Sequence, residues 1–304
     1  LLSSTNKQSV AVLRRRGWQE YQLPVLEAQE REAIIVRYLA EFHKSLNNRQ
    51  IEEITDDAKS CHPLFLKTLL EELRLVPRHE DLDRTIDTYL GVADTEQLFQ
   101  MILGRIEADF PEVRVDELLG AIALSRTGLA ASVIAGLCDT TPLQVSELVA
   151  SLDFHLVRKQ GRLTFFHSYL RRAVKARYLG TNEQRTPIDR RFALYFAEND
   201  RTTADHLELI AAYQRLGETD RLVSYITAIN TALSLYRSDS RFELLTIIKE
   251  ITDDGIELTP QFEATIERRI TGGRDEGADH PGSLDAGVSI QAERLTDLTD
   301  FIGL

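Results

Sequence analysis

Hydroxyl side chains at the start of the sequence could contact a nucleotide phosphate. Residues 1–5 read LLSST, an apolar stub that ends in hydroxyl groups. A hydroxyl at the end of a central strand can sense a γ-phosphate or orient an attacking water, so Ser4 and Thr5 are candidate nucleotide-binding residues. The alternative is a strand or loop fragment whose serines cap a neighbouring segment.

A second candidate for phosphate binding is His167, which follows two phenylalanines where a predicted hairpin passes into a helix. Histidine can donate a hydrogen bond to a phosphate oxygen, and the N-terminus of a helix favours an anion. A histidine that is hydrogen-bonded for structural reasons would explain the same position.

Pro63 opens the strongly apolar stretch PLFLKTLLEEL at residues 63–73. Proline suits the first position of a helix, because the N–H that it lacks would have no partner there. A core helix that begins with proline explains this stretch without any ligand.

A basic segment stands out in an acidic chain. The 304 residues hold 36 Lys and Arg against 48 Asp and Glu, a net charge of −12, yet residues 151–180 carry seven cations and only Asp153 as an acid. A basic winged helix is a DNA-binding hypothesis. The alternative is that the cations pair with acidic neighbours. The cations are Arg158, Lys159, Arg162, Arg171, Arg172, Lys175 and Arg177.

The elements that must position these residues are mainly α-helical. Apolar side chains spaced three and four residues apart predict a small helical bundle over 21–112 and paired helices over 182–270. Between them, 113–181 reads as three helices, a hairpin that turns at Gln160-Gly161, and a closing helix. This order predicts a winged helix-turn-helix. Its third helix, 142–152, holds no Lys or Arg, which weighs against base recognition.

Further segments complete the predicted organisation. Residues 1–20 are interpreted as the end of a nucleotide-binding α/β domain. Residues 182–270 are interpreted as a helical arm of hairpins, which is TPR-like but is not assigned as tetratricopeptide repeats because no clean 34-residue repeat is visible. Five glycines and a proline within 271–288 predict a flexible linker. Residues 289–304 are interpreted as the start of a further repeat region, and the absence of an initial Met suggests a piece of a longer protein.

Several classes of protein are disfavoured by what the sequence lacks. Two cysteines exclude a disulfide scaffold, and no apolar run has the roughly 18–20 residues of a membrane span. The sequence holds no Gly-x-x-x-x-Gly-Lys-Ser/Thr phosphate loop and no Gly-x-Gly-x-x-Gly dinucleotide-binding motif. It also holds no His-Glu-x-x-His motif of zinc proteases and no Gly-x-Ser-x-Gly nucleophile motif. We therefore expect a cytoplasmic chain that is not catalytic alone, without metal ligands of its own.

The features resemble, in this order, the C-terminal part of the ATPase module of STAND-class signalling ATPases, an AAA-type group of P-loop proteins. The resemblance is to NACHT- and NB-ARC-like members of the nephrocystin and telomerase-associated type, and it runs from residue 1 to about 250. The motifs that carry it are LLSST at 1–5, LPVL at 23–26, HPLFLKTLLEEL at 62–73, LSRTGL at 124–129 and GRLTFFH at 161–167.

The resemblance implies that 21–112 is the helical lid domain of the ATPase module, and it implies roles for single residues. Ser4 and Thr5 would end the sensor-1 strand, Pro63 would pack against the base and ribose, and His167 would contact the β-phosphate of ADP. His62 replaces the family's usual Asn or Gly, and Ser168 replaces its aspartate. The phosphate loop and the Mg²⁺-binding acidic motif would precede this chain, so ADP or ATP with Mg²⁺ is expected in a full-length parent.

The free energy of a single hydrogen bond limits how tightly these residues could bind a nucleotide alone. One charge-assisted hydrogen bond contributes roughly 1.5–3 kcal/mol, whereas micromolar binding requires about 8 kcal/mol. We therefore expect a regulatory portion that senses ADP or ATP held by a preceding nucleotide-binding domain and does not bind it tightly alone. Expected partners are that domain, proteins bound through the arm or C-terminal repeats, and further copies on activation. Nucleic acid and membranes are not expected partners.

Two alternatives remain. A winged-helix transcriptional regulator with a helical effector domain would place the basic residues on a solvent-facing surface, and a helical scaffold would need no ligand.

Overall fold

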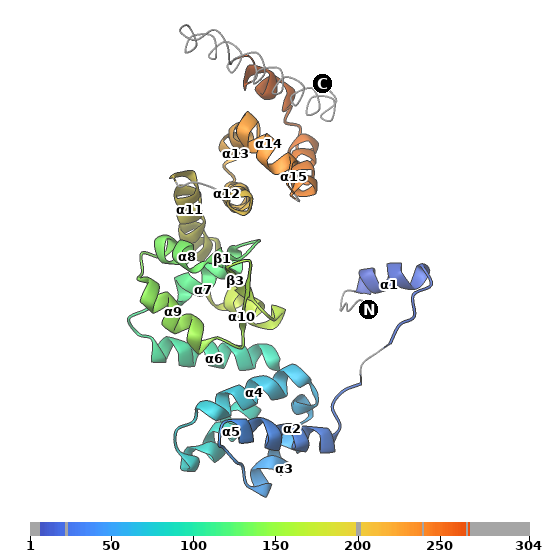
Figure 1. Ribbon diagram of the computed structural model, residues 1–304, viewed down its shortest axis with the longest axis vertical. Coiled ribbons are helices and arrows are strands. Elements are labelled where there is room, and N and C mark those ends of the chain that lie inside the picture. Colours follow the sequence, from blue (N-terminus) through green and yellow to red (C-terminus); the bar gives the residue numbers. More distant parts are fainter. Residues whose placement is uncertain (1–6, 22–23, 199–201, 239, 266, 268–304) are drawn as a thin grey trace, which may run out of the picture. The chain divides into compact units, whose positions relative to one another are not determined.

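The computed structural model describes residues 7–21, 24–198, 202–238, 240–265 and 267 (Figure 1). Within these ranges the chain is mainly α-helical with one small sheet, as predicted. Ser4, Thr5, the predicted linker at 271–288 and the predicted repeat start at 289–304 lie outside the described residues.

The chain divides into two compact units, Leu1–Gly104 and Arg105–Leu304. The helices of the first unit are α1 (Lys7–Arg15), α2 (Ala28–Glu41), α3 (Asn48–Asp56), α4 (Pro63–Leu75) and α5 (Leu82–Leu90), with 3-10 turns at Ala58–Cys61 and His79–Asp81. Helix α6 (Thr95–Asp109) spans the division. The predicted domain boundary at 112/113 stays a prediction.

Helix α4 forms the centre of the first unit. It begins at Pro63, as the sequence predicts, and its Phe65, Leu69 and Leu70 are fully buried. Helices α2 and α5 pack against it. Helix α3 ends at Asp56, and Ala58 lies in the 3-10 turn that follows it.

Residues 115–178 contain the three helices, the hairpin and the closing helix that the sequence predicts, and we call this region the winged helix. Its elements are α7 (Val115–Leu124), β1 (Leu129–Ala130), α8 (Ala131–Leu137), α9 (Pro142–Ser151), β2 (Leu156–Lys159), β3 (Arg162–Phe165) and α10 (Ser168–Tyr178). The strands form an antiparallel sheet in the order β1-β3-β2. Gln160 and Gly161 form the hairpin turn with φ of 49° and 78°, the left-handed pair that suits a two-residue loop.

Strand β1 is a difference from the sequence prediction, which gave three helices, a hairpin and a closing helix but no third strand. Leu129 pairs with Leu163, and Ala130 pairs with Arg162. Two residues are too few to show an alternating pattern, so only the partner strand defines this strand.

The helical arm consists of α11 (Asn182–Glu198), α12 (Thr203–Leu216), α13 (Thr219–Ile226), α14 (Ile229–Tyr236) and α15 (Arg241–Asp253). Helix α11 packs along α12, α12 contacts α13 and α14, and α14 packs on α15 (Figure 1). This is the predicted array of helical hairpins. Helix α11 also packs on α7 and α8, so the arm and the winged helix share a core.

Gly128 offers a test of the turn between α7 and β1. Its φ is +81°, and an added Cβ would lie 2.7 Å from the Leu163 carbonyl oxygen. We expect Gly128→Ala to lower the free energy of unfolding by more than about 2 kcal/mol in urea titrations, since strain and a backbone clash add.

The matched control is Gly161→Ala, because Gly161 has φ of +78° with no atom within 4 Å of an added Cβ. It should cost only about 1 kcal/mol. Equal losses for the two variants would contradict the close approach at Gly128.

Candidate functional site

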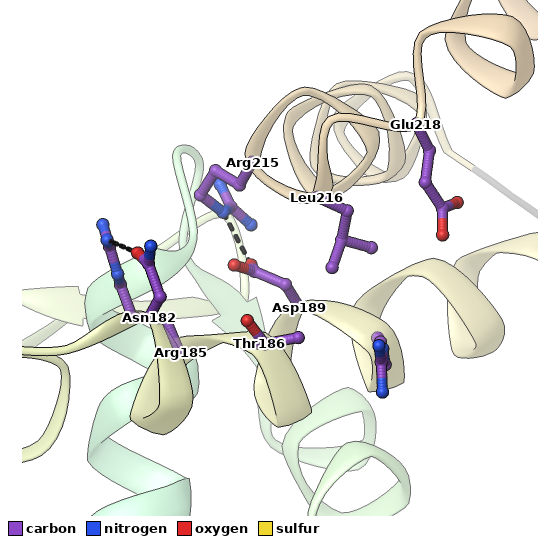
Figure 2. Close-up of a pocket in the computed structure, with 8 residues that line it drawn as sticks. Asn182, Arg185, Thr186, Asp189, Arg215, Leu216 and Glu218 are labelled. Carbon is purple, nitrogen blue, oxygen red and sulfur yellow. Dashed lines mark hydrogen bonds and ion pairs between the residues drawn. The ribbon is translucent and has the colours of Figure 1, made fainter.

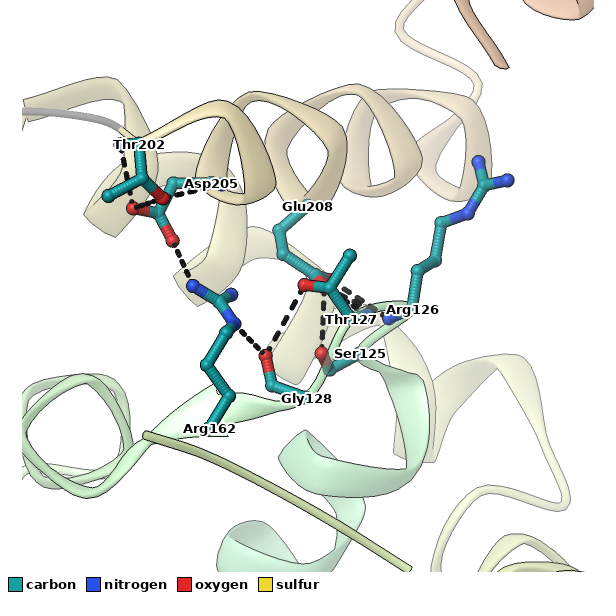
Figure 3. A network of polar contacts seen from close by, with 8 residues as sticks. All are labelled: Ser125, Arg126, Thr127, Gly128, Arg162, Thr202, Asp205 and Glu208. Atoms are coloured by element: carbon teal, nitrogen blue, oxygen red, sulfur yellow. Dashed lines mark hydrogen bonds and ion pairs between the residues drawn. The ribbon is translucent and has the colours of Figure 1, made fainter. Parts of the chain in front are cut away.

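The loop between α7 and β1 encloses the carboxylate of Glu208, which is fully buried. Its Oε1 accepts hydrogen bonds from Ser125 Oγ at 2.7 Å, from Arg126 N at 3.0 Å, and from Thr127 N and Oγ1 at 2.9 and 2.7 Å (Figure 3). An ionised carboxylate away from water is stable only when donors replace its hydration. Residues 125–128 therefore fold around this side chain of α12.

A second carboxylate of the same helix contacts the winged helix. Asp205 Oδ1 accepts from Arg162 Nη1 at 3.0 Å, and Arg162 Nε donates to the Gly128 carbonyl at 2.7 Å (Figure 3). Arg162 thus connects strand β3, the loop and α12. We call the loop 125–128 with Arg162, Asp205 and Glu208 the arm junction.

Asp205 also caps its own helix. Its Oδ2 accepts from Thr202 N at 2.9 Å and from Thr202 Oγ1 at 2.7 Å. Burial alone would raise the pKa of Asp205, but the hydrogen bonds from Thr202 and Arg162 outweigh burial and leave this pKa below its ordinary value. The charged form is therefore the one that the fold favours.

Two arginines converge on the C-terminal end of α7. Arg171 Nε donates to the Ala123 carbonyl at 3.1 Å, and its Nη2 donates to the Ser125 carbonyl. Arg215 Nη1 lies 3.5 Å from the Leu124 carbonyl oxygen, and its Nε donates to Asp189 at 2.6 Å. Cations complement the partial negative charge at the end of a helix, so α10 and α12 both stabilise α7 where the enclosing loop begins.

A further carboxylate pairs with the closing helix of the winged helix. Glu107 of α6 accepts from Arg177 Nε at 2.8 Å and from Nη2 at 2.6 Å, and from the Tyr178 hydroxyl. The hydrogen bond with Arg177 lowers the pKa of Glu107, although burial opposes the shift. The alternative in which the cations of 151–180 pair with acidic neighbours is thus confirmed for Arg162 and Arg177.

Other cations of residues 151–180 lie against an aromatic ring or are exposed. Arg172 lies over the ring of Tyr169, 4.4 Å from its centroid. Arg158 and Lys159 are exposed on the outer end of β2.

The predicted nucleotide-contacting residues occupy separate units. Pro63 is exposed at the first position of α4 in the first unit. His167 is half-buried in the second unit, immediately before α10, and makes no capping hydrogen bond to that helix. Its ring meets that of Phe166 edge-on, with centroids 4.4 Å apart. The predicted contacts of Pro63 and His167 with a nucleotide stay predictions.

Sequence reasoning missed both carboxylates of the arm junction. Asp205 and Glu208 lie in the segment DHLELIAAY, where an acid between apolar residues is the only signal. Such acids are ordinarily solvated, and the donors that surround Glu208 begin 83 residues earlier in the chain.

Part of the chain is similar to a known protein. A stretch of 177 residues is 29% identical to a TPR repeat-containing protein of Dictyostelium discoideum, and the match covers 56% of this chain and 11% of that protein. No protein-family model and no solved structure matches the chain.

Two kinds of feature are absent from the described residues. They include no helix with the length and apolar character to cross a membrane. They also include no cluster of three His, Cys, Asp or Glu side chains placed to bind a metal ion.

Glu208→Gln tests the arm junction. The amide keeps the shape of the side chain, but it presents either an uncharged oxygen or an NH₂ group to the donors of residues 125–127. We expect a loss of about 2–4 kcal/mol in unfolding free energy, and faster hydrogen exchange at the Arg126 and Thr127 amides. Glu147→Gln, an exposed glutamate on α9, is the matched control and should change neither quantity. Unchanged exchange at both amides in Glu208→Gln would contradict the enclosure.

Asp205→Asn gives a pH-dependent prediction. Because the folded pKa of Asp205 lies below its unfolded value, its charge contributes stability that is complete above the ordinary aspartate pKa of about 4 and is lost as the pH falls through the folded pKa. Asparagine cannot titrate. The wild type should exceed Asp205→Asn by about 1–3 kcal/mol at pH 7, and this difference should shrink below pH ~4 in parallel urea titrations. A constant difference across that range would rule out this linkage.

Proposed function

We propose that this chain is the regulatory part of a STAND-type signalling ATPase, in which the winged helix passes the nucleotide state to a helical arm that binds protein partners. The arm junction is the observation that carries the proposal. A buried carboxylate on α12 and the ion pair between Arg162 and Asp205 join the arm to the winged helix. A movement of the winged helix would therefore be transmitted to the arm.

The arrangement of charge supports a protein-interaction role over DNA binding. Arg162 and Arg177 face acids of the same unit, and Arg171 donates to main-chain carbonyls. The helix that would enter the major groove, α9, holds no Lys or Arg. Its exposed side chains include Leu143 and Glu147, which suit a protein contact better than a polyphosphate backbone.

The similarity to a TPR repeat-containing protein supports the same role. TPR proteins stack helical hairpins that expose extended binding surfaces. In this chain α11–α15 would supply such a surface.

His167 and Pro63 are the proposed nucleotide contacts in a full-length protein. His167 stands before the N-terminus of α10, where main-chain N–H groups favour an anion. When bound, Mg²⁺ with ADP or ATP would supply the change in phosphate charge that the switch reads. The residues that would bind Mg²⁺ are expected in a preceding domain. His167 would favour one state over the other, since a population shift requires different contacts in the two states.

The test is His167→Ala in the full-length protein. We expect roughly 10-fold or greater loss of ADP affinity, the equivalent of one charge-assisted hydrogen bond, and higher basal signalling. His79→Ala, at an exposed histidine of the first unit, is the control and should leave both unchanged. ADP affinity that does not change in His167→Ala would refute the phosphate contact.

DNA binding is the alternative function, and the exposed pair Arg158 and Lys159 on the hairpin is the observation in its favour. A gel shift of the whole chain with duplex DNA at low salt tests it. Binding that is abolished by Arg158→Gln with Lys159→Gln would favour DNA over the proposed function.

A further inference from the structure

A cavity of about 350 Å³ lies between the first turns of α11 and the end of α12 (Figure 2). Three arginines line it, together with polar groups and two acids. Its lining is Asn182, Arg185, Thr186, Asp189, Arg190, Arg215, Leu216 and Glu218. The size falls within the range of small-molecule sites.

Both acids of the lining already have cationic partners. Asp189 is almost completely buried and accepts from Arg215 Nε at 2.6 Å. Glu218 accepts from Arg221 at 3.0 Å, and Arg221 lies outside the lining. Arg185 donates to the Asn182 amide oxygen, a neutral acceptor, and within the described part of the chain Arg190 has no ion-pair partner. The cavity therefore presents guanidinium groups whose charge is not neutralised locally.

Helix α10 adds to this excess of positive charge. Burial lowers the pKa of Lys175, and Arg171, Arg215 and Arg185 lower it further. Lys175 is therefore close enough to these arginines to be repelled by them. Such a concentration of cations in a chain of net charge −12 costs free energy unless an anion joins it.

We propose that the cavity between α11 and α12 binds a small phosphate monoester through Arg185 and Arg190. Guanidinium groups bind phosphate oxygens in a forked, two-bond geometry, and the Thr186 hydroxyl and the Asn182 amide lie in the same wall. The site is distinct from the nucleotide contact proposed for His167, and one can fail while the other holds. A ligand here would touch both helices of the first arm hairpin and stabilise their packing.

Titration of the whole chain with inorganic phosphate and with glycerol 3-phosphate, followed by NMR at constant ionic strength set with chloride, tests the proposal. We expect shifts at the amides of Arg185, Thr186 and Arg190. We also expect a rise in the pKa of Lys175, because a bound dianion offsets the repulsion from its neighbours.

Arg185→Gln with Arg190→Gln should weaken binding at least about 10-fold and remove the change at Lys175. Arg215 is left intact, because its loss would leave Asp189 buried without a partner. Arg158→Gln, on the hairpin, removes one exposed cation elsewhere and should bind like the wild type.

Three results would overturn the proposal. The first is an absence of localised shifts with either probe, and the second is equal weakening in Arg158→Gln. The third is binding of a phosphoserine peptide without binding of either small probe, which would assign the cavity to a protein ligand. Binding of both small probes with loss in the double variant supports it.

Discussion

The second unit depends on the enclosure of one carboxylate, that of Glu208. Removing an ionised group from water costs several kcal/mol unless donors surround it, so the segment that supplies the donors has little freedom. Here those donors are main-chain N–H groups and hydroxyls of residues 125–127. The enclosing segment follows the end of α7 and is followed by the left-handed Gly128 and by strand β1, which pairs with β3.

The same unit shows how an acidic protein accommodates a basic segment. Acids on α6 and α12 meet Arg177 and Arg162, while the carbonyls at the end of α7 meet Arg171. Each contact joins two elements that are distant in sequence. Three of the seven cations of residues 151–180 are therefore used to assemble the winged helix with its neighbours, while Arg158 and Lys159 stay exposed at the end of β2.

The sequence was sufficient for features that depend on neighbouring residues. Pro63 as a helix start and the Gln160-Gly161 turn follow from local backbone chemistry, and both are confirmed. Strand β1 and the burial of Glu208 could not be predicted, because each depends on a partner far along the chain. The cavity follows from the packing of α11 against α12, and the spacing of residues within α11 does not specify that packing.

The two carboxylates of α12 stand three residues apart, almost one turn of helix. A helix advances about 1.5 Å and rotates about 100° per residue, so one residue inserted or deleted between Asp205 and Glu208 would turn one of them away from its partners. The stretch 202–208 thus sets the rotational phase of every later helix in the arm relative to the winged helix. Changes of length during divergence should accumulate after Gly217, where the chain leaves α12, and be rare before it.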